Sequence, residues 1–189
     1  MEELKQRILK DGIVLNNSVI KVDKFLNHQL DITLLDNIGS EFYHHFMDQE
    51  ITKILTIEAS GIAVATLTAL YFNVPVVFAR KSESITHPED KYSADVYSFT
   101  HEKQFNIFVS REYLKPGDKI LVIDDFLANG QALLGMARIV HEAGATLVGA
   151  GIVIEKSFQD GGKLVRDAGI NVFSLARIKN MSDSGITFL

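Results

Sequence analysis

The sequence contains no cysteine, and basic residues do not outnumber acidic ones. The lack of cysteine excludes disulfides and thiolate-bound metals, and it fits a reducing cytosol, so we expect a cytoplasmic protein. The 24 acidic and 19 basic residues give a formal net charge of −5. No overall basic field therefore draws the chain to nucleic acid or to an anionic membrane, and we expect neither as a partner.

An apolar leader is also missing, because charged residues interrupt the first stretch, MEELKQRILKDG. One uncharged run, residues 59–79, is long enough for a membrane-spanning helix. However, Asn73 and Pro75 interrupt the run, and proline disfavours helix at the residue before it. We interpret the run as a buried helix over residues 60–72, a turn and a strand over residues 76–79.

Helical and strand patterns alternate along the rest of the 189 residues. Further helices are predicted at residues 2–10, 32–47, 130–143 and 163–168. Further extended segments are predicted at residues 14–22, 51–57, 92–99, 105–110, 119–123, 146–154 and 171–175, the pair 92–99 and 105–110 as a hairpin. This alternation predicts an α/β fold with a mostly parallel central sheet flanked by helices. No repeat or linker divides it, so residues 1–189 are interpreted as one domain.

The most informative stretch is KILVIDDFLANGQA, residues 119–132, in which a hydrophobic strand leads into two adjacent aspartates. In open α/β sheets, ligands bind beyond the carboxyl ends of the strands. Asp124 and Asp125 would need hydrogen-bond donors or a cation there, such as vicinal sugar hydroxyls or a metal ion. The small-residue loop that follows exposes backbone N–H groups at a helix start, which suits a phosphate. Together these features predict a site for a ribose 5-phosphate.

A purely structural interpretation is that the aspartates cap the next helix and that Gly130 makes the turn. One aspartate would suffice for a cap, so the pair favours a ligand site.

The same stretch resembles the phosphoribosyl-diphosphate (PRPP) motif of type I phosphoribosyltransferases. VIKVDKFLNHQLD, TIEASGI, VPVVFARK and GIVIEKSFQ are similar to segments of the bacterial xanthine phosphoribosyltransferases and occur in the expected order. The resemblance implies the type I phosphoribosyltransferase fold with a small N-terminal hood, over about residues 1–35. The implied reaction is transfer of 5-phosphoribosyl from PRPP to xanthine, giving xanthosine 5′-monophosphate and pyrophosphate. Mg²⁺ would accompany PRPP, with no metal held by the protein alone, and the chain would form a homodimer.

The resemblance also assigns site residues. Asp124 and Asp125 would be catalytic, at the ribose. The residues that would bind PRPP through its 5-phosphate are Ala128, Asn129, Gly130, Gln131 and Ala132. The residues that would bind pyrophosphate are Glu58, Ala59, Ser60, Gly61, Arg80 and Lys81. The residues that would bind xanthine are Ile20, Asn27 and Lys156. The family usually has serine or threonine in the phosphate loop, whereas Asn129 and Ala132 occupy such positions here, as in the xanthine branch.

Several of these assignments have a simpler alternative. Ser60 is also a suitable N-cap for the next helix. Arg80, Lys81 and Lys156 would fit solvated strand ends equally well. The polar residues 81–91 are interpreted as a lid over the reacting centre, the alternative being a surface loop without a role.

Three other functions compete with xanthine transfer. A guanine or hypoxanthine phosphoribosyltransferase would use the same fold. A PRPP-sensing regulator would need a DNA-binding module, which the sequence does not suggest. A response-regulator receiver also contains a strand ending in acidic residues. However, it carries them near its start, and too few residues follow Asp125 here.

Overall fold

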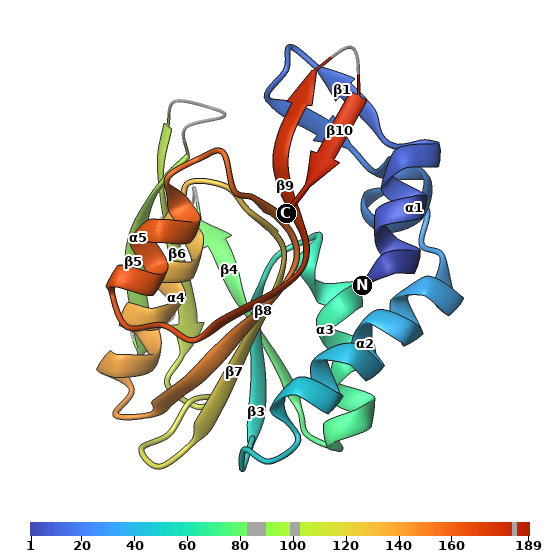
Figure 1. Ribbon diagram of the computed structural model, residues 1–189. Helices are drawn as coiled ribbons and strands as arrows, with labels where there is room; N and C mark the ends of the chain where they lie inside the picture. Colours follow the sequence, from blue (N-terminus) through green and yellow to red (C-terminus); the bar gives the residue numbers. More distant parts are fainter. Residues whose placement is uncertain (83–89, 99–102, 183–184) are drawn as a thin grey trace.

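The computed structural model describes residues 1–82, 90–98, 103–182 and 185–189 (Figure 1). Most of the predicted lid, residues 83–89, lies outside these described residues. The helices are α1 (Glu2–Asp11), η1 (Asp23–Asn27, a π-helix), α2 (Ile32–Phe46), α3 (Gly61–Phe72), α4 (Gln131–Glu142) and α5 (Gly161–Asp167). The strands are β1 (Ile13–Leu15), β2 (Val19–Lys21), β3 (Lys53–Ile57), β4 (Val76–Ser82), β5 (Lys91–Ser98), β6 (Lys103–Ser110), β7 (Lys119–Leu127), β8 (Thr146–Lys156), β9 (Val172–Ser182) and β10 (Gly185–Phe188).

The central sheet has the strand order β10-β9-β8-β7-β3-β4-β6-β5. Its middle strands, from β9 to β4, are parallel, as predicted. Both edges are antiparallel, since β6 pairs with β4 and β5, and β10 pairs with β9. The sheet is therefore mixed. The hairpin of β5 and β6 is confirmed, whereas β10 was not predicted.

Helices cover both faces of the sheet (Figure 1). Helices α2 and α3 pack on one face and α4 and α5 on the other. In β3, Ile54 belongs to the core on the α3 side and Leu55 to the core on the α4 side. The central strands are apolar on both faces because successive side chains point to opposite sides, and both sides are covered. No helix in the described ranges is long and apolar enough to cross a membrane.

The N-terminal segment differs from its prediction as one extended stretch over residues 14–22. It forms a hairpin, because Asn16 and Asn17 adopt positive φ angles of 50° and 54°. The Ser18 N–H donates to the Leu15 carbonyl at 3.2 Å across this turn. Asparagine tolerates the left-handed region better than most residues and therefore favours such tight turns.

This hairpin, α1 and η1 gather at one end of the molecule with β9 and β10 (Figure 1). The Met1 ammonium donates to the Leu175 carbonyl at 2.7 Å, and Leu4 and Ile8 of α1 share a core with Ile178 and Met181 of β9. The strand predicted at residues 171–175 continues to Ser182, and β10 pairs with it antiparallel. The last strands thus support the N-terminal segment, although they are distant from it in sequence.

Candidate active site

The two aspartates lie inside β7, not after its end as predicted, because β7 extends to Leu127. The pairing of β7 with β3 stops at Val122, whereas its pairing with β8 continues to Leu127. Asp124 and Asp125 are therefore placed where β7 has lost its neighbour β3. Pairing with β8 holds the two aspartates in place, and the absence of β3 beside them leaves space next to their carboxylates.

The aspartate pair is buried, with Asp124 5% and Asp125 7% exposed. The Asp125 N–H donates to Asp124 Oδ1 at 3.0 Å. Burial, and then the charge of Asp125, raise the pKa of Asp124 well above its ordinary value, although the charge of Lys81 opposes this rise. Two crowded carboxylates with few donors can bind a cation or the hydroxyls of a sugar.

The loop after β7 is shaped by Gly130, whose φ of 76° favours glycine. A Cβ at this position would also lie 2.9 Å from Val165 Cγ1. Gly130 is the N-cap of α4 and has no side chain to bond the first N–H groups of the helix. These groups and the positive end of the helix dipole can accept a phosphate.

A hollow of about 160 Å³ joins this loop to Asp124 and Phe126. Its far wall consists of Val96, Tyr97 and Phe105, from β5 and β6. None of these three was predicted as a site residue. The antiparallel pairing of β6 with β4, which brings the hairpin to this edge, has no local sequence signal.

The segment from Glu58 to Gly61 joins β3 to α3 and packs against the aspartates. A Cβ on Gly61 would collide with Thr56 Oγ1 and lie 3.1 Å from Asp124 Oδ1. Ser60 occupies the N-cap position of α3, but its side chain makes no capping hydrogen bond. The alternative interpretation of Ser60 as the N-cap is therefore met in position but not by a side-chain hydrogen bond. The peptide bond between Glu58 and Ala59 is cis.

The predicted cationic pair lies beside this segment. The Lys81 N–H donates to Glu58 Oε1 at 2.6 Å, and Arg80 Nε lies 3.9 Å from Glu58 Oε2. Lys81 Nζ also lies 5.5 Å from the centre of the Phe105 ring. Arg80 and Lys81 fall within β4 rather than after it, and they reach the group around Asp124 because β4 is the parallel neighbour of β3.

Lys156, at the end of β8, is not a freely solvated lysine. Its Nζ donates to the Ser18 carbonyl of the N-terminal hairpin at 2.9 Å and lies 5.6 Å from the Phe126 ring centre. Burial lowers the pKa of this ammonium. Lys156 thus connects the hairpin turn to the strand that carries the aspartates.

The other two residues expected at the base lie in different surroundings. Ile20 on β2 is only 5% exposed and belongs to the core that includes Ile8 of α1. Asn27 is the last residue of η1 and is exposed. The hairpin turn reaches Lys156 through Ser18, not through either of these side chains.

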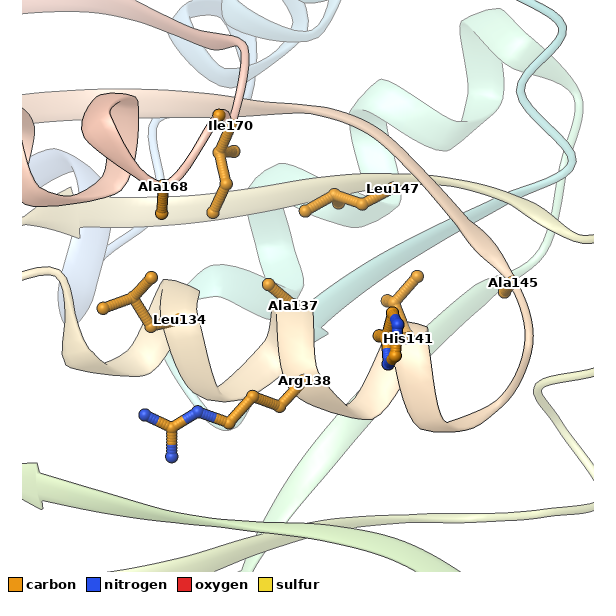
Figure 2. Close-up of a pocket in the computed structure, with 10 residues that line it drawn as sticks. Leu134, Ala137, Arg138, His141, Ala145, Leu147, Ala168 and Ile170 are labelled. Atoms are coloured by element: carbon orange, nitrogen blue, oxygen red, sulfur yellow. The ribbon is translucent and has the colours of Figure 1, made fainter.

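A larger hollow, of about 450 Å³, lies between α4 and the segments around Leu147 and Ile170 (Figure 2). Leu134, Ala137 and Arg138 of α4 are among the residues that line it (Figure 2). It lies near the start of β8, and its lining contains no carboxylate. The chemistry needed for a sugar phosphate is therefore found at the smaller hollow beside Asp124.

The fold and this group of residues define an α/β protein with a site suited to a sugar phosphate at the carboxyl ends of its parallel strands. The chain belongs to the phosphoribosyl transferase domain family, which matches residues 21–175.

Its relatives include proteins named xanthine phosphoribosyltransferase. That of Ruminiclostridium cellulolyticum is 56% identical over 188 residues, which cover 100% of this chain and 99% of the relative. That of Lachnoclostridium phytofermentans is 53% identical, with 96% and 94% covered. Among solved structures, the adenine phosphoribosyltransferase of Rhodothermus marinus has a TM-score of 0.76 at 21% identity, with 94% of this chain and 99% of that chain covered. This last likeness concerns the fold alone.

Proposed function

We propose that the protein transfers the 5-phosphoribosyl group of PRPP to xanthine, giving xanthosine 5′-monophosphate and pyrophosphate, in purine salvage. The observation that carries this proposal is the identity of 56% to a xanthine phosphoribosyltransferase over the full chain. The buried carboxylate pair beside an uncapped helix start supplies the chemistry that such a substrate needs.

In this proposal each part of PRPP meets one group of residues. Asp124 and Asp125 accept hydrogen bonds from the ribose hydroxyls. The backbone of residues 128–132 surrounds the 5-phosphate, and Gly130 keeps a side chain out of the way. Residues 58–61 receive the pyrophosphate, with Arg80 and Lys81 supplying positive charge.

The reaction asks little covalent chemistry of the chain. The bond from the ribose C1 to pyrophosphate breaks, positive charge develops on the sugar ring, and N9 of the base bonds to C1. The base loses its N9 proton, and pyrophosphate leaves with the electron pair of the broken bond. The protein therefore acts by positioning the partners and by stabilising charge, with Asp124 near the cationic ring and Lys81 near the leaving group.

Phosphoribosyltransferases generally use Mg²⁺ with PRPP. Within the described ranges no cluster of three or more metal-ligating side chains is present, so PRPP itself would supply most of the ligands. Asp124 and Asp125 are the carboxylates of this site that could add to them. The cation would neutralise charge on the leaving pyrophosphate.

The base would lie between Phe126 and the N-terminal hairpin, with the Lys156 ammonium donating to a purine keto oxygen. Asn27 would read the polar edge of xanthine and Ile20 would border its ring. Because Ile20 is only 5% exposed and Asn27 faces solvent, this assignment requires the hood, about residues 1–35, to adjust when the base binds.

We further propose a single domain that forms a homodimer. The supporting feature is the outer side of α3 and β4, where Leu70 is 68% and Phe78 is 43% exposed. Exposed apolar side chains on adjoining elements are typical of protein interfaces. Sedimentation of the purified protein would test this assembly.

The decisive assay incubates the protein with PRPP, Mg²⁺ and either xanthine, guanine or hypoxanthine, and follows nucleotide formation. Xanthine should give the highest kcat/KM. Preference for another base would assign the protein to guanine or hypoxanthine transfer. PRPP binding without any turnover would favour a regulator.

A further inference from the structure

A buried carboxylate at the end of β8, Glu155, collects hydrogen bonds from several elements and is only 1% exposed. Arg166 of α5 donates to both of its oxygens, from Nη2 at 2.7 Å and from Nη1 at 3.1 Å. Arg177 of β9 donates at 3.3 Å, and the hydroxyls of Ser157 and Ser174 donate at 2.9 Å and 2.5 Å. Burial would raise the pKa of Glu155, but these bonds outweigh it and lower the pKa to about 2. Glu155 is therefore a fixed anion.

The helix that carries Arg166 supports the proposed phosphate loop directly. The Gly161 N–H donates to the Ala128 carbonyl at 3.1 Å. A Cβ on Gly161 would lie 2.6 Å from both Asn129 C and Gly130 N, and a Cβ on Gly130 would lie 2.9 Å from Val165 Cγ1. No side chain separates the two backbones here, so a shift of α5 must move the loop.

The ion pair determines where α5 lies. Arg166 follows Val165 in α5, and its Nη1 also donates to the Gly162 carbonyl at 2.9 Å, near the helix start. Glu155 pairs in the sheet with Leu127, the residue just before the loop. The ion pair of Glu155 and Arg166 thus links the sheet, next to the end of β7 that leads into the loop, to helix α5, which packs against the loop. A helix as short as α5 depends on such tertiary contacts, because it is only marginally stable alone.

We propose that Glu155 and Arg166 are positioning residues for PRPP, holding α5 where it keeps the backbone N–H groups of residues 128–131 aimed at the 5-phosphate. This inference rests on the proposed function of that loop. Neither residue lines the hollow beside Asp124. They act through Gly161 and Gly130, and their effect should therefore appear in PRPP binding rather than in base binding.

The chain offers a matched control, because Arg166 and Arg177 bind the same carboxylate from different elements. Arg166→Met removes the hydrogen bonds from α5 to Glu155, whereas Arg177→Met keeps them and removes only the one from β9. Displacement of a binding group by about 1 Å changes rates on the order of 10- to 100-fold. We expect Arg166→Met to raise the KM for PRPP by roughly that factor, while the KM for xanthine changes less than about threefold. Arg177→Met should leave the KM for PRPP within about twofold, even if its melting temperature falls.

A conservative variant separates positioning from a general loss of stability. Arg166→Lys keeps the charge but not the two-pronged hydrogen bond, so it should recover part of the PRPP affinity. If Arg166→Met does not fold, the same comparison between Arg166→Lys and Arg177→Lys decides the matter.

Hydrogen exchange of the substrate-free protein gives a readout that needs no activity. The amides of residues 128–131 should exchange faster in the Arg166 variant and at the wild-type rate in the Arg177 variant. Equal effects of the two variants on KM for PRPP and on exchange would overturn the inference and leave a purely structural ion network. If wild-type protein shows no PRPP-dependent turnover, the proposed function fails, whereas the exchange experiment still tests the link between α5 and the loop.

Discussion

Removing the charge of Asp124 should make the protein more stable and nearly inactive. Asp124 is 5% exposed and lies beside Asp125, which is 7% exposed, so the fold holds two carboxylates with little solvent. Asp124→Asn removes one charge and keeps an oxygen that can accept the Asp125 N–H, now bonded at 3.0 Å. Functional sites often hold such destabilising arrangements, and relieving one gains about 0.5–2 kcal/mol.

The size of this gain can be converted into a melting temperature. For a domain of this length, 1 kcal/mol corresponds to about 2–4 °C, so we expect Asp124→Asn to melt roughly 1–8 °C higher near neutral pH. The gain must also depend on pH. The pKa of Asp124 is raised by burial and by Asp125. The folded state therefore favours the protonated carboxyl of Asp124, and this stabilisation is complete below the pKa of the unfolded state. It is lost as the pH rises through the pKa of the folded state, where Asp124 becomes charged.

The difference in melting temperature between variant and wild type should consequently grow from pH 5 to pH 8. Thermal unfolding followed by circular dichroism at these two pH values measures it. Asp48→Asn changes an exposed residue just after α2, so it serves as the control and should show no such trend. Nucleotide formation by Asp124→Asn should fall by orders of magnitude. A variant that melts below wild type at pH 8, or a difference that shrinks as the pH rises, would refute this account of the pair.

Three further predictions concern neighbouring parts of the site. Gly61→Ala should abolish activity and lower the melting temperature, because its Cβ would collide with Thr56 Oγ1. Adding Thr56→Ala should restore part of the lost stability. If the double variant melts no higher than Gly61→Ala, the collision is not the cause. Lys156→Ala should lower kcat/KM for xanthine, guanine and hypoxanthine together. Asn27→Ala should instead narrow the ratio of kcat/KM for xanthine to kcat/KM for hypoxanthine, by roughly tenfold or more. If that ratio stays fixed, Asn27 has only a structural role. Because the pKa of Glu155 is lowered from 4.5 to about 2, its charge stabilises the fold above pH 4.5 and loses this effect as the pH falls toward 2. Glu155→Gln should thus reduce the free energy of unfolding by about 3 kcal/mol at pH 7, as measured by urea titration, and an unchanged midpoint would contradict this.

Local patterns were sufficient for most elements of the fold. The apolar run after Ser60 and the break at Asn73 and Pro75 predicted α3 and β4, and Asn73 indeed ends the helix in the left-handed conformation, with a φ of 54°. Alternation of strands and helices predicted the parallel centre of the sheet. These features depend on neighbouring residues, whose side-chain spacing and backbone preferences can be read directly from the chain.

The errors occur where pairing overrode local preference. The strands β7, β8 and β9 run past their predicted ends at residues 123, 154 and 175, because each has hydrogen-bonded neighbours that extend further, β10 in the case of β9. Strand β10 exists because β9 presents an edge to it. Residues 14–22 have the composition of one extended segment, but Asn16 and Asn17 adopt positive φ angles and divide it into a hairpin.

By itself, the sequence determined the kind of site: two aspartates, a loop of small residues with a glycine, and a helix start, all within residues 119–132. Such chemistry is local, so it appears as a motif. Only the tertiary structure decided what surrounds it. Three features join segments that meet only when the sheet and its hairpins assemble. They are the wall made by Tyr97 and Phe105, the hydrogen bond from Lys156 to Ser18, and the ion pair of Arg166 with Glu155. The free energy that places these groups comes from burial and pairing across the whole fold, and no single stretch of the chain contains it.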